Sequence, residues 1–587
     1  MKTVRVGCAS GFWGDTREGA RQLVERGDIN YLVFDYLAEI TMALLARIKA
    51  KKPEAGFVPD LIETVAPLLP EIMKRGIKVV ANGGGMNPQA AADALKTRAE
   101  ALGLHPRIAV IIGDDVLPLA ACADFTDMFT GQAVPQNLTS ANAYLGARPI
   151  AQALALGADI VITGRCVDSA VLLGPAIHEF DIAPTDSDRL SAMSLAGHLV
   201  ECGAQVTGGI FTDWQDVPGW DDMGFPIAVL REDGSFDITK PENTGGLVSP
   251  LSVAEQMLYE IDDPAQYRLP DVVCDWRDVT LTQSGPDVVT VQGCKGAVPT
   301  GQLKVSATAL DGFRVMATIT IIGRDAARKA RRTGDAILQR ARRMMMARGF
   351  ADFTETSIEI IGAGTVYGND AKTSNARDVV LKIGARHTDE KALTLLASEI
   401  VPAATAMAQG LTGFFAGRPN VAPVFRGYSF LISANALTPT ILFEGRELSV
   451  AHPSHHAAFP IAPIPTMTAN ATGSVAVPLV RLAVGRSGDK GNNANIGVIA
   501  RQPAYLPFIK AALTTETVKT FFAATGVTHV DVYELPGIAA LNFVLHNSLG
   551  GGGVASLRID PQGKGFAQML MDFPVPVSPA LAQELNG

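Results

Sequence analysis

Residues 485–495 read GRSGDKGNNAN and concentrate polar chemistry in one short stretch. The glycines permit positive φ angles, so backbone N–H groups can point together into a nest that binds anions. Arg486 and Lys490 add positive charge beside that nest. Asp489 can hold Lys490 in place, or it can act as an acid or base if burial shifts its pKa. The stretch therefore predicts a site loop for an anionic ligand, with a salt-bridged tight turn as the structural alternative.

A second glycine-rich stretch, HNSLGGGGVASLRID, spans residues 546–560 at a predicted junction between two strands. Four consecutive glycines carry a large conformational entropy cost. Close approach of a ligand, or of another backbone, commonly offsets that cost. We expect His546 and Asn547 to lie within reach of the same ligand, and a flexible hinge is the alternative.

Polar residues also follow five predicted strands in the first 210 residues. The runs KTVRVGC, INYLVFD, GIKVVAN, RIAVIIG and GADIVITG are rich in β-branched residues and are each followed by a helical pattern, which predicts a parallel sheet buried on both faces. Ligands bind beyond the carboxyl ends of such strands, where the sequence places Ser10, Asp35, Asn82, Asp114, Asp115, Arg165 and Asp168. Each of these loops alone could turn the chain or cap a helix. Together they predict a cleft.

The pattern of alternating strands and helices ends at about residue 210. Asp-Gly pairs at 233–234 and 311–312 lie between alternating runs, and we interpret both as β-hairpins. A basic stretch at 325–349 has apolar residues at helical spacing, which favours a helix with a core face and solvated arginines over a nucleic-acid-binding stripe. The residues of that predicted core face are Ala326, Ala330, Ile337, Leu338, Ala341, Met344 and Met345.

The bulk composition limits the class of protein. A chain of 587 residues exceeds the roughly 250–300 residues at which single cores stop growing. The net charge of −9 offers no attraction for nucleic acid or anionic membranes. No apolar run approaches the roughly 20 residues of a membrane helix, and the N-terminus does not resemble a signal peptide. We therefore expect a soluble, cytoplasmic protein, with reduced cysteines and a homo-oligomeric state on base rates.

The fold class predicted from these patterns is α/β, with two domains. Residues 1–458 are expected to form a large domain with a mostly parallel sheet flanked by helices, divided into a parallel βα part at about 1–210 and a mixed, hairpin-containing part at about 211–458. The stretch FPIAPIPTMTANATGS within residues 459–474 is interpreted as a linker. Residues 475–587 are expected to form a small α+β domain, with an antiparallel sheet, a last strand in VASLRID and helices on one face.

Two further features could carry chemistry. His452, His455 and His456 lie together, but their spacing matches no strong metal signature, so we assign no metal. Cys8 stands before a predicted helix, where thiol pKa values fall. A nucleophilic role needs a general base that the sequence alone does not identify.

The segments GCASGFWGD, YLVFDYLAE, VVANGGGMNP and ITGRCVDSA, followed by RSGDKGNNANIGVIAR, LNFVLHNSLGGGGVASLRID and QGKGFAQ, resemble the acyclic terpene utilisation protein A family. The resemblance spans nearly the whole chain. It implies a large α/β domain followed by a ferredoxin-like one. It also implies a place in bacterial breakdown of citronellol- and geraniol-type terpenoids through CoA thioesters.

Our leading hypothesis is an enzyme, a hydratase, dehydratase or related lyase, that acts on an unsaturated or hydroxylated acyl-CoA and needs no cofactor. Asp489, Lys490 and Asp168 are the candidate catalytic residues. Backbone N–H groups of the glycine-rich stretches would stabilise an enolate. The expected substrate-binding residues are Ser10, Asn82, Arg165, Arg486, Ser487, Gly488, Asn492, Asn495, Asn547, Gly551 and Gly552. The alternatives are an ATP- and magnesium-dependent ligase or kinase that uses Asp114 and Asp115, and a non-catalytic scaffold subunit.

Overall fold

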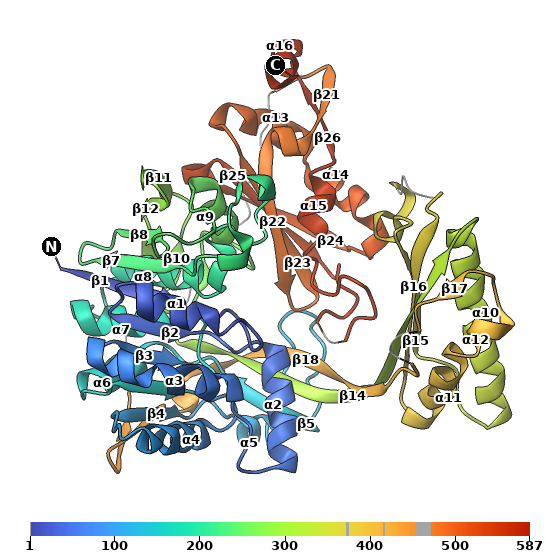
Figure 1. The fold of residues 1–587 in the computed structure, drawn as a ribbon. Helices are drawn as coiled ribbons and strands as arrows, with labels where there is room; N and C mark the ends of the chain where they lie inside the picture. The colour runs from blue at the N-terminus through green and yellow to red at the C-terminus, as the bar shows by residue number, and fades with distance from the viewer. Residues whose placement is uncertain are drawn as a thin grey trace.

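The computed structural model describes residues 2–370, 375–414, 417–453, 457, 471–553 and 555–586. Within these residues, an 11-stranded mixed sheet forms the centre of the large domain (Figure 1). A long β-ribbon leads from this domain to a separate arm, and the C-terminal domain lies over one edge of the large domain. Figure 1 therefore shows three bodies, of which the arm was not expected as a separate unit.

The five predicted strands are present and lie side by side in parallel at the middle of the central sheet, in the order β1 (Thr3–Cys8), β2 (Tyr31–Phe34), β3 (Lys78–Ala81), β6 (Ile160–Thr163) and β4 (Ile108–Ile112). Antiparallel strands extend both edges: β7 (Ile227–Arg231), β8 (Phe236–Thr239), β12 (Val288–Gln292) and β11 (Thr280–Gly285) on one side, and β19 (Thr440–Phe443) and β20 (Arg446–Ser449) on the other. The expectation of a mostly parallel sheet is therefore wrong for its edges. Strands joined by tight hairpins, such as β7 and β8, can pair only antiparallel.

Helices cover both faces of the central sheet. One hydrophobic cluster joins the sheet to α1 (Glu18–Arg26), α2 (Glu39–Lys51), α3 (Pro59–Arg75) and α4 (Pro88–Ala101). A second cluster on the other face includes α6 (Arg148–Ala155), α7 (Ala170–Phe180), α8 (Ser187–Val200) and α9 (Pro250–Met257). The short α5 (Leu117–Ala120) lies beside β5 (Leu138–Ala143), and β9 (Tyr267–Arg268), β10 (Val273–Asp275) and β13 (Lys295–Ala297) form a small separate sheet.

The ribbon that leads to the arm consists of β14 (Gln302–Ile322) and β18 (Val421–Ser433). The hairpin predicted at Asp311 and Gly312 is wrong, because β14 runs through both residues and the register with β18 shifts there as a β-bulge. Gly312 takes a φ of 77° in this bulge, and the Asp311 carboxylate accepts hydrogen bonds from Arg386 and Arg426. A turn-forming pair can therefore become a bulge when partner strands hold both sides.

The arm has its own hydrophobic core. It contains the far half of β14 with β15 (Glu355–Ile361), β16 (Asp378–His387) and β17 (Leu411–Thr412), covered by α10 (Ala326–Ala347), α11 (Glu390–Ile400) and α12 (Ala403–Ala406). The basic stretch is α10, and its predicted apolar face packs on this core, with Met344 only partly buried. The prediction of a core face backed by solvated arginines is confirmed.

The C-terminal domain is built on a four-stranded antiparallel sheet in the order β22 (Ala483–Lys490), β23 (Asn493–Ala500), β25 (Ala540–His546) and β24 (His529–Leu535). The further elements are β21 (Val475–Pro478), β26 (Pro574–Val577), α13 (Leu506–Ala512), α14 (Thr515–Phe521), α15 (Phe566–Leu570) and α16 (Pro579–Asn586). The predicted strand in VASLRID is wrong, since its described part, 555–560, contains no strand.

Part of the predicted linker, 459–470, lies outside the described residues, as do His455 and His456. Residues 471–474 lead into β21 without helix or strand. In the part of the chain that the structure describes, no helix has the length and apolar character of a membrane span.

Candidate functional site

A cavity of about 1180 Å³ lies at the carboxyl ends of the central parallel strands. Its floor comes from the start of α2, which contributes Glu39, and from the loop after β6, which contributes Arg165 and Asp168. Its roof is the tip of the β22–β23 hairpin, including Asp489 and Lys490, together with the glycine-rich loop of the C-terminal domain. The β14–β18 ribbon forms a side wall. The cavity is therefore assembled from segments far apart in the sequence.

Arg165 organises the floor of the cavity. Its side chain is 2% exposed, and its Nη1 donates to Asp168 at 2.5 Å and to the Cys166 carbonyl at 3.0 Å. The guanidinium stacks 4.0 Å from the Tyr144 ring centroid, and its Nε has no hydrogen-bond partner. Asp168 is 36% exposed and faces the cavity lining. The floor thus presents a fixed, buried cation next to a carboxylate that a ligand can reach.

Glu39 and Lys304 complete this floor network. The Tyr144 hydroxyl donates to Glu39 at 2.5 Å, and Lys304 Nζ donates to the same carboxylate at 3.4 Å. Burial alone would raise the pKa of Glu39, but Lys304 and Arg165 outweigh it, so the pKa lies well below its usual range. Glu39 is therefore a charged group that balances two cations.

Ser10 and Asn82 lie beneath the floor and do not line the cavity. Asn82 donates from Nδ2 to the Asp35 carboxylate. The Ser10 hydroxyl donates to the Asp35 carbonyl, and the Asp35 N–H donates to the Ser10 carbonyl. Burial, together with the charge of Asp168, raises the pKa of Asp35 well above its usual range. The structure thus places Ser10 and Asn82 in a buried network that supports the floor.

Asp114 and Asp115, on which the nucleotide alternative depended, also do not line the cavity. The Asp114 carboxylate accepts hydrogen bonds from the Arg165 backbone N–H at 2.9 Å and from Asn142 at 2.8 Å. The Asp115 carboxylate accepts a hydrogen bond from the backbone N–H of Leu117, the first residue of α5. Both carboxylates therefore orient loops.

Asp489 is the central carboxyl group of the roof. Its side chain is 21% exposed and accepts from Gln562 at 3.1 Å and from Lys564 Nζ at 3.4 Å. Burial and the nearby charge of Glu260 raise the pKa of Asp489 to about 7, against the opposing effect of Lys564. Such a group exists in both protonation states near neutral pH, which suits an acid–base role.

Lys490 follows on the other face of β22. Its Nζ donates to the Glu260 carbonyl at 2.6 Å and lies 5.1 Å from the Tyr267 ring centroid. Burial would lower the pKa of Lys490, but Tyr267 and the acidic groups around it raise it above its usual range. Lys490 is therefore a permanent cation in the cavity.

The predicted site loop is a β-hairpin, in which β22 and β23 are joined by Gly491 and Asn492 alone. Asn492 Oδ1 accepts from the Gly551 N–H at 2.7 Å, which ties the hairpin tip to the glycine-rich loop. A Cβ on Gly552 would lie 2.0 Å from the Gly491 oxygen. The close approach of the glycine-rich loop to the hairpin tip therefore explains why residue 552 is glycine. Gly550, Gly551, Gly552 and Gly553 all have positive φ angles.

Besides Ser10 and Asn82, five further predicted substrate-binding residues lie outside the cavity: Arg486, Ser487, Gly488, Asn495 and Asn547. Arg486 is 4% exposed and forms an ion pair of 3.1 Å with Glu255, whose side chain is fully buried in α9. The Ser487 hydroxyl donates to the Gly563 carbonyl. Asn547 contacts Asn492 and Thr528. Arg486 also donates to Gln205 and to the Gly209 carbonyl of the large domain, so it is a contact between domains.

Gly488 and Asn495 belong to the same domain interface. A Cβ on Gly488 would lie 2.6 Å from the Tyr259 ring. Asn495 donates to the Leu258 carbonyl and accepts from the Glu260 N–H. These contacts hold the segment after α9 against the C-terminal domain. They thereby place Glu260 beside Asp489 and Lys490.

Other candidate chemistry lies away from the cavity. Cys8 is buried, and burial raises the pKa of its thiol, which is the opposite of what a nucleophile needs. His452 is half-buried with an unpartnered Nε2. Among the described residues, no group of three or more His, Cys, Asp or Glu side chains could hold a metal ion.

Sequence analysis missed several cavity residues, namely Glu39, Tyr144, Glu260, Tyr267 and Lys304, and also Lys564, which contacts Asp489. Glu39 had a usable signal, because it opens the helix after a strand whose end carries Asp35. Lys564 lies in the motif QGKGFAQ, to which no role was given. The other residues meet the site only through long-range packing.

The strand ends of the central sheet and the small antiparallel C-terminal domain together enclose the cavity. Residues 4–443 match the family described as "Acyclic terpene utilisation family protein AtuA", and residues 477–576 match the "AtuA ferredoxin-like domain". The chain belongs to the acyclic terpene utilisation protein A family. No curated protein matches it at a significant level.

Proposed function

We propose that this protein is an enzyme of acyclic terpenoid breakdown that adds water to, or removes it from, an acyl thioester. Hydration of an enoyl thioester forms a C–O bond at the β-carbon and a C–H bond at the α-carbon, and dehydration reverses both steps. The reaction consumes or releases only water, so it balances without an oxidant. It needs a group that exchanges a proton and a positive environment for the enolate oxygen.

The proposal rests on the raised pKa of the Asp489 carboxyl group in the cavity. Its pKa, raised to about 7, allows the carboxylate to remove a proton from water and the carboxylic acid to return one. Lys564 and Gln562 fix the orientation of the carboxyl group. Asp168 would position the attacking water from the opposite side of the cavity, because Arg165 holds its Oδ1 in place.

Positive charge for the enolate would come from Lys490. Its ammonium group lies in the cavity lining and stays charged across the physiological pH range. The backbone N–H groups of Gly551 and Gly552 border the same space, but both already donate, to Asn492 and to the Leu549 carbonyl, so Lys490 is the main cation for the enolate. Arg268 is exposed and lines the cavity, so it is a candidate contact for a phosphate of the carrier.

The test is turnover of branched enoyl-CoA and 3-hydroxyacyl-CoA substrates by the purified full-length protein. We expect Asp489→Asn to lower kcat by a factor of about 10² to 10⁴ and Lys490→Ala to lower it by about 10². The control is Asp572→Asn, an exposed carboxylate of the same domain outside the cavity, which should leave kcat unchanged. If both cavity variants keep wild-type turnover, the assignment is wrong.

A further inference from the structure

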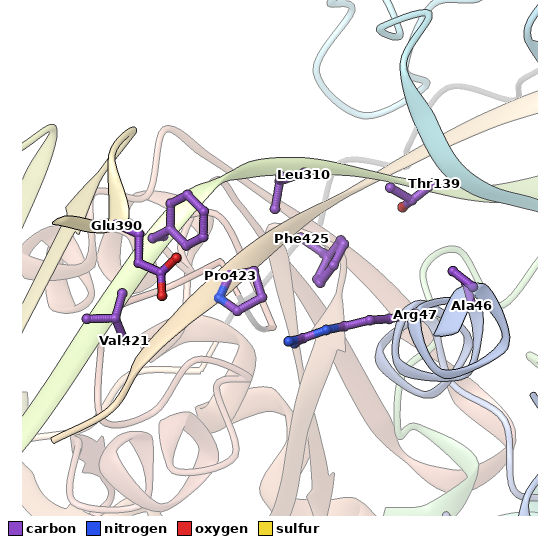
Figure 2. A pocket seen from close by; sticks show the side chains of 10 residues that line it. Ala46, Arg47, Thr139, Leu310, Glu390, Val421, Pro423 and Phe425 are labelled. Atoms are coloured by element: carbon purple, nitrogen blue, oxygen red, sulfur yellow. The ribbon is translucent and has the colours of Figure 1, made fainter. Parts of the chain in front are cut away.

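A second cavity of about 580 Å³ lies between α2 and the β14–β18 ribbon, near the junction with the arm. Figure 2 shows its lining, in which Arg47 extends from α2 toward Pro423. Apolar side chains dominate, and the polar members are Arg47, Thr139 and Glu390. The apolar lining residues are Ala46, Ala50, Leu310, Phe313, Val421, Pro423 and Phe425. The proposed reaction does not use this cavity.

One face of α2 runs past both cavities. Glu39, Ile40 and Ala43 line the main cavity, and Ala46, Arg47 and Ala50 line the second. Residues three or four positions apart lie on the same side of a helix. The helix therefore connects the two cavities over about 16 Å, at a rise of 1.5 Å per residue.

One face of β14 also lines both cavities. Alternate residues of a strand share a face, and Lys304, Ser306 and Thr308 line the main cavity while Leu310 lines the second. The bulge after Leu310 inserts one extra residue, so Phe313 returns to the face that Leu310 occupies and also lines the second cavity. The bulge that replaced the predicted hairpin thus keeps apolar side chains on this face.

Phe425 of β18 lies where the two cavities meet. It pairs directly with Leu310 and lines both cavities. On one side of it the ribbon presents Lys304 and Ser306, and on the other side it presents Phe313 and Pro423. The lining therefore changes from polar to apolar along one continuous surface.

We propose that the two cavities form one groove, in which the acyl head lies in the main cavity and the hydrocarbon tail runs past Phe425 into the second cavity. This inference rests on the proposed function for its ligand class, a thioester with a long branched aliphatic chain. The continuity of α2 and of the ribbon across both cavities argues for one occupant. Each methylene that the apolar segment removes from water strengthens binding by about fourfold at most.

The test measures dissociation constants of two saturated, unreactive branched acyl-CoA thioesters by calorimetry, one with an acyl chain of about five carbons and one with about ten. We expect the wild type to bind the longer chain at least about tenfold more tightly. Leu310→Gln and Ala46→Trp should weaken binding of the longer chain by about fourfold or more, with little effect on the shorter chain.

Leu44→Gln is the matched control, because Leu44 is 43% exposed on α2 outside both cavities and Leu310 is 46% exposed. It should change neither dissociation constant. Equal affinities of the wild type for both thioesters, no binding of either, or a chain-length preference that survives both groove variants would overturn the groove. A preserved preference without any turnover of the enoyl analogues would instead refute only the lyase reaction.

Discussion

Asp489 Oδ1 lies 3.4 Å from Lys564 Nζ, and this ion pair joins the tip of β22 to the loop before α15 at the roof of the cavity. Lys564 also contacts Glu260 at 3.0 Å, on the segment that follows α9 in the large domain. The protonation of Asp489 is therefore set jointly by both domains.

Protonation of Asp489 should make the stability of the folded protein depend on pH. Its pKa rises from 3.8 to about 7 in the folded protein, so the folded state holds a proton that the unfolded chain loses above about pH 4. The stability contributed by this proton is complete below about pH 4 and is lost as the pH rises through about 7. Asp489→Asn does not titrate, so its Tm relative to wild type should rise by about 2 °C or more between pH 5 and pH 8. A constant difference in calorimetric Tm would show that the Asp489 carboxyl has an ordinary pKa.

Lys304 should act on stability with the opposite pH sign. It helps to hold the pKa of Glu39 below its usual range, and this stabilisation is present above the unfolded pKa and lost as the pH falls. Lys304→Met should therefore lower Tm at pH 7 and have less effect at pH 3. Thermal unfolding at the two pH values measures this, and an equal loss at both would attribute the effect of Lys304 to packing alone.

Removal of Arg486 should destabilise the contact between the domains. Arg486→Ala leaves the fully buried Glu255 without its cation, which costs about 3–5 kcal/mol in similar buried pairs. The double variant Arg486→Met with Glu255→Leu removes both charges and should recover much of that loss. Chemical denaturation measures both variants. If the double variant is no more stable than Arg486→Ala, the ion pair is not the cause.

Gly552 should tolerate a methyl group less well than Gly526. Both glycines have positive φ angles, 70° and 80°. A Cβ on Gly552 would meet the Gly491 oxygen at 2.0 Å, whereas one on Gly526 would meet nothing within 4 Å. Gly526→Ala should cost about 1 kcal/mol from backbone strain alone, and Gly552→Ala should cost at least about 2 kcal/mol more because the two loops must separate. Equal free energies of unfolding would mean that the close approach of the loops is not required.

The five central strands and their parallel direction followed from local pattern, since each is an apolar run before a helix, but their order in the sheet, with β6 between β3 and β4, did not. α3 was missed because Pro67 and Pro70 lie inside it, and proline normally ends helices. The arm was missed because β14 is continuous through Asp311 and Gly312, and only its partner strands reveal that. Local sequence therefore predicted individual strands and helices better than it predicted which strands pair with one another.

The same limit applied to the site. Arg165, Asp168, Asp489 and Lys490 stood out by residue type and were brought to one cavity by the fold. Arg486 stood out equally, but it is already paired with Glu255, which lies 231 positions away, and it also donates to Gln205 and to the Gly209 carbonyl. No local pattern distinguishes a charged residue that awaits a ligand from one that is already paired.

The most direct test of the account is a crystal structure of the protein with an unreactive 3-hydroxyacyl-CoA analogue. We predict density for the acyl group between Asp489 and the Arg165–Asp168 pair, with its oxygen within hydrogen-bond distance of the Asp489 carboxyl group. Density for the acyl group at any place that leaves Asp489 and Asp168 in contact with solvent alone would contradict a shared site between the two domains.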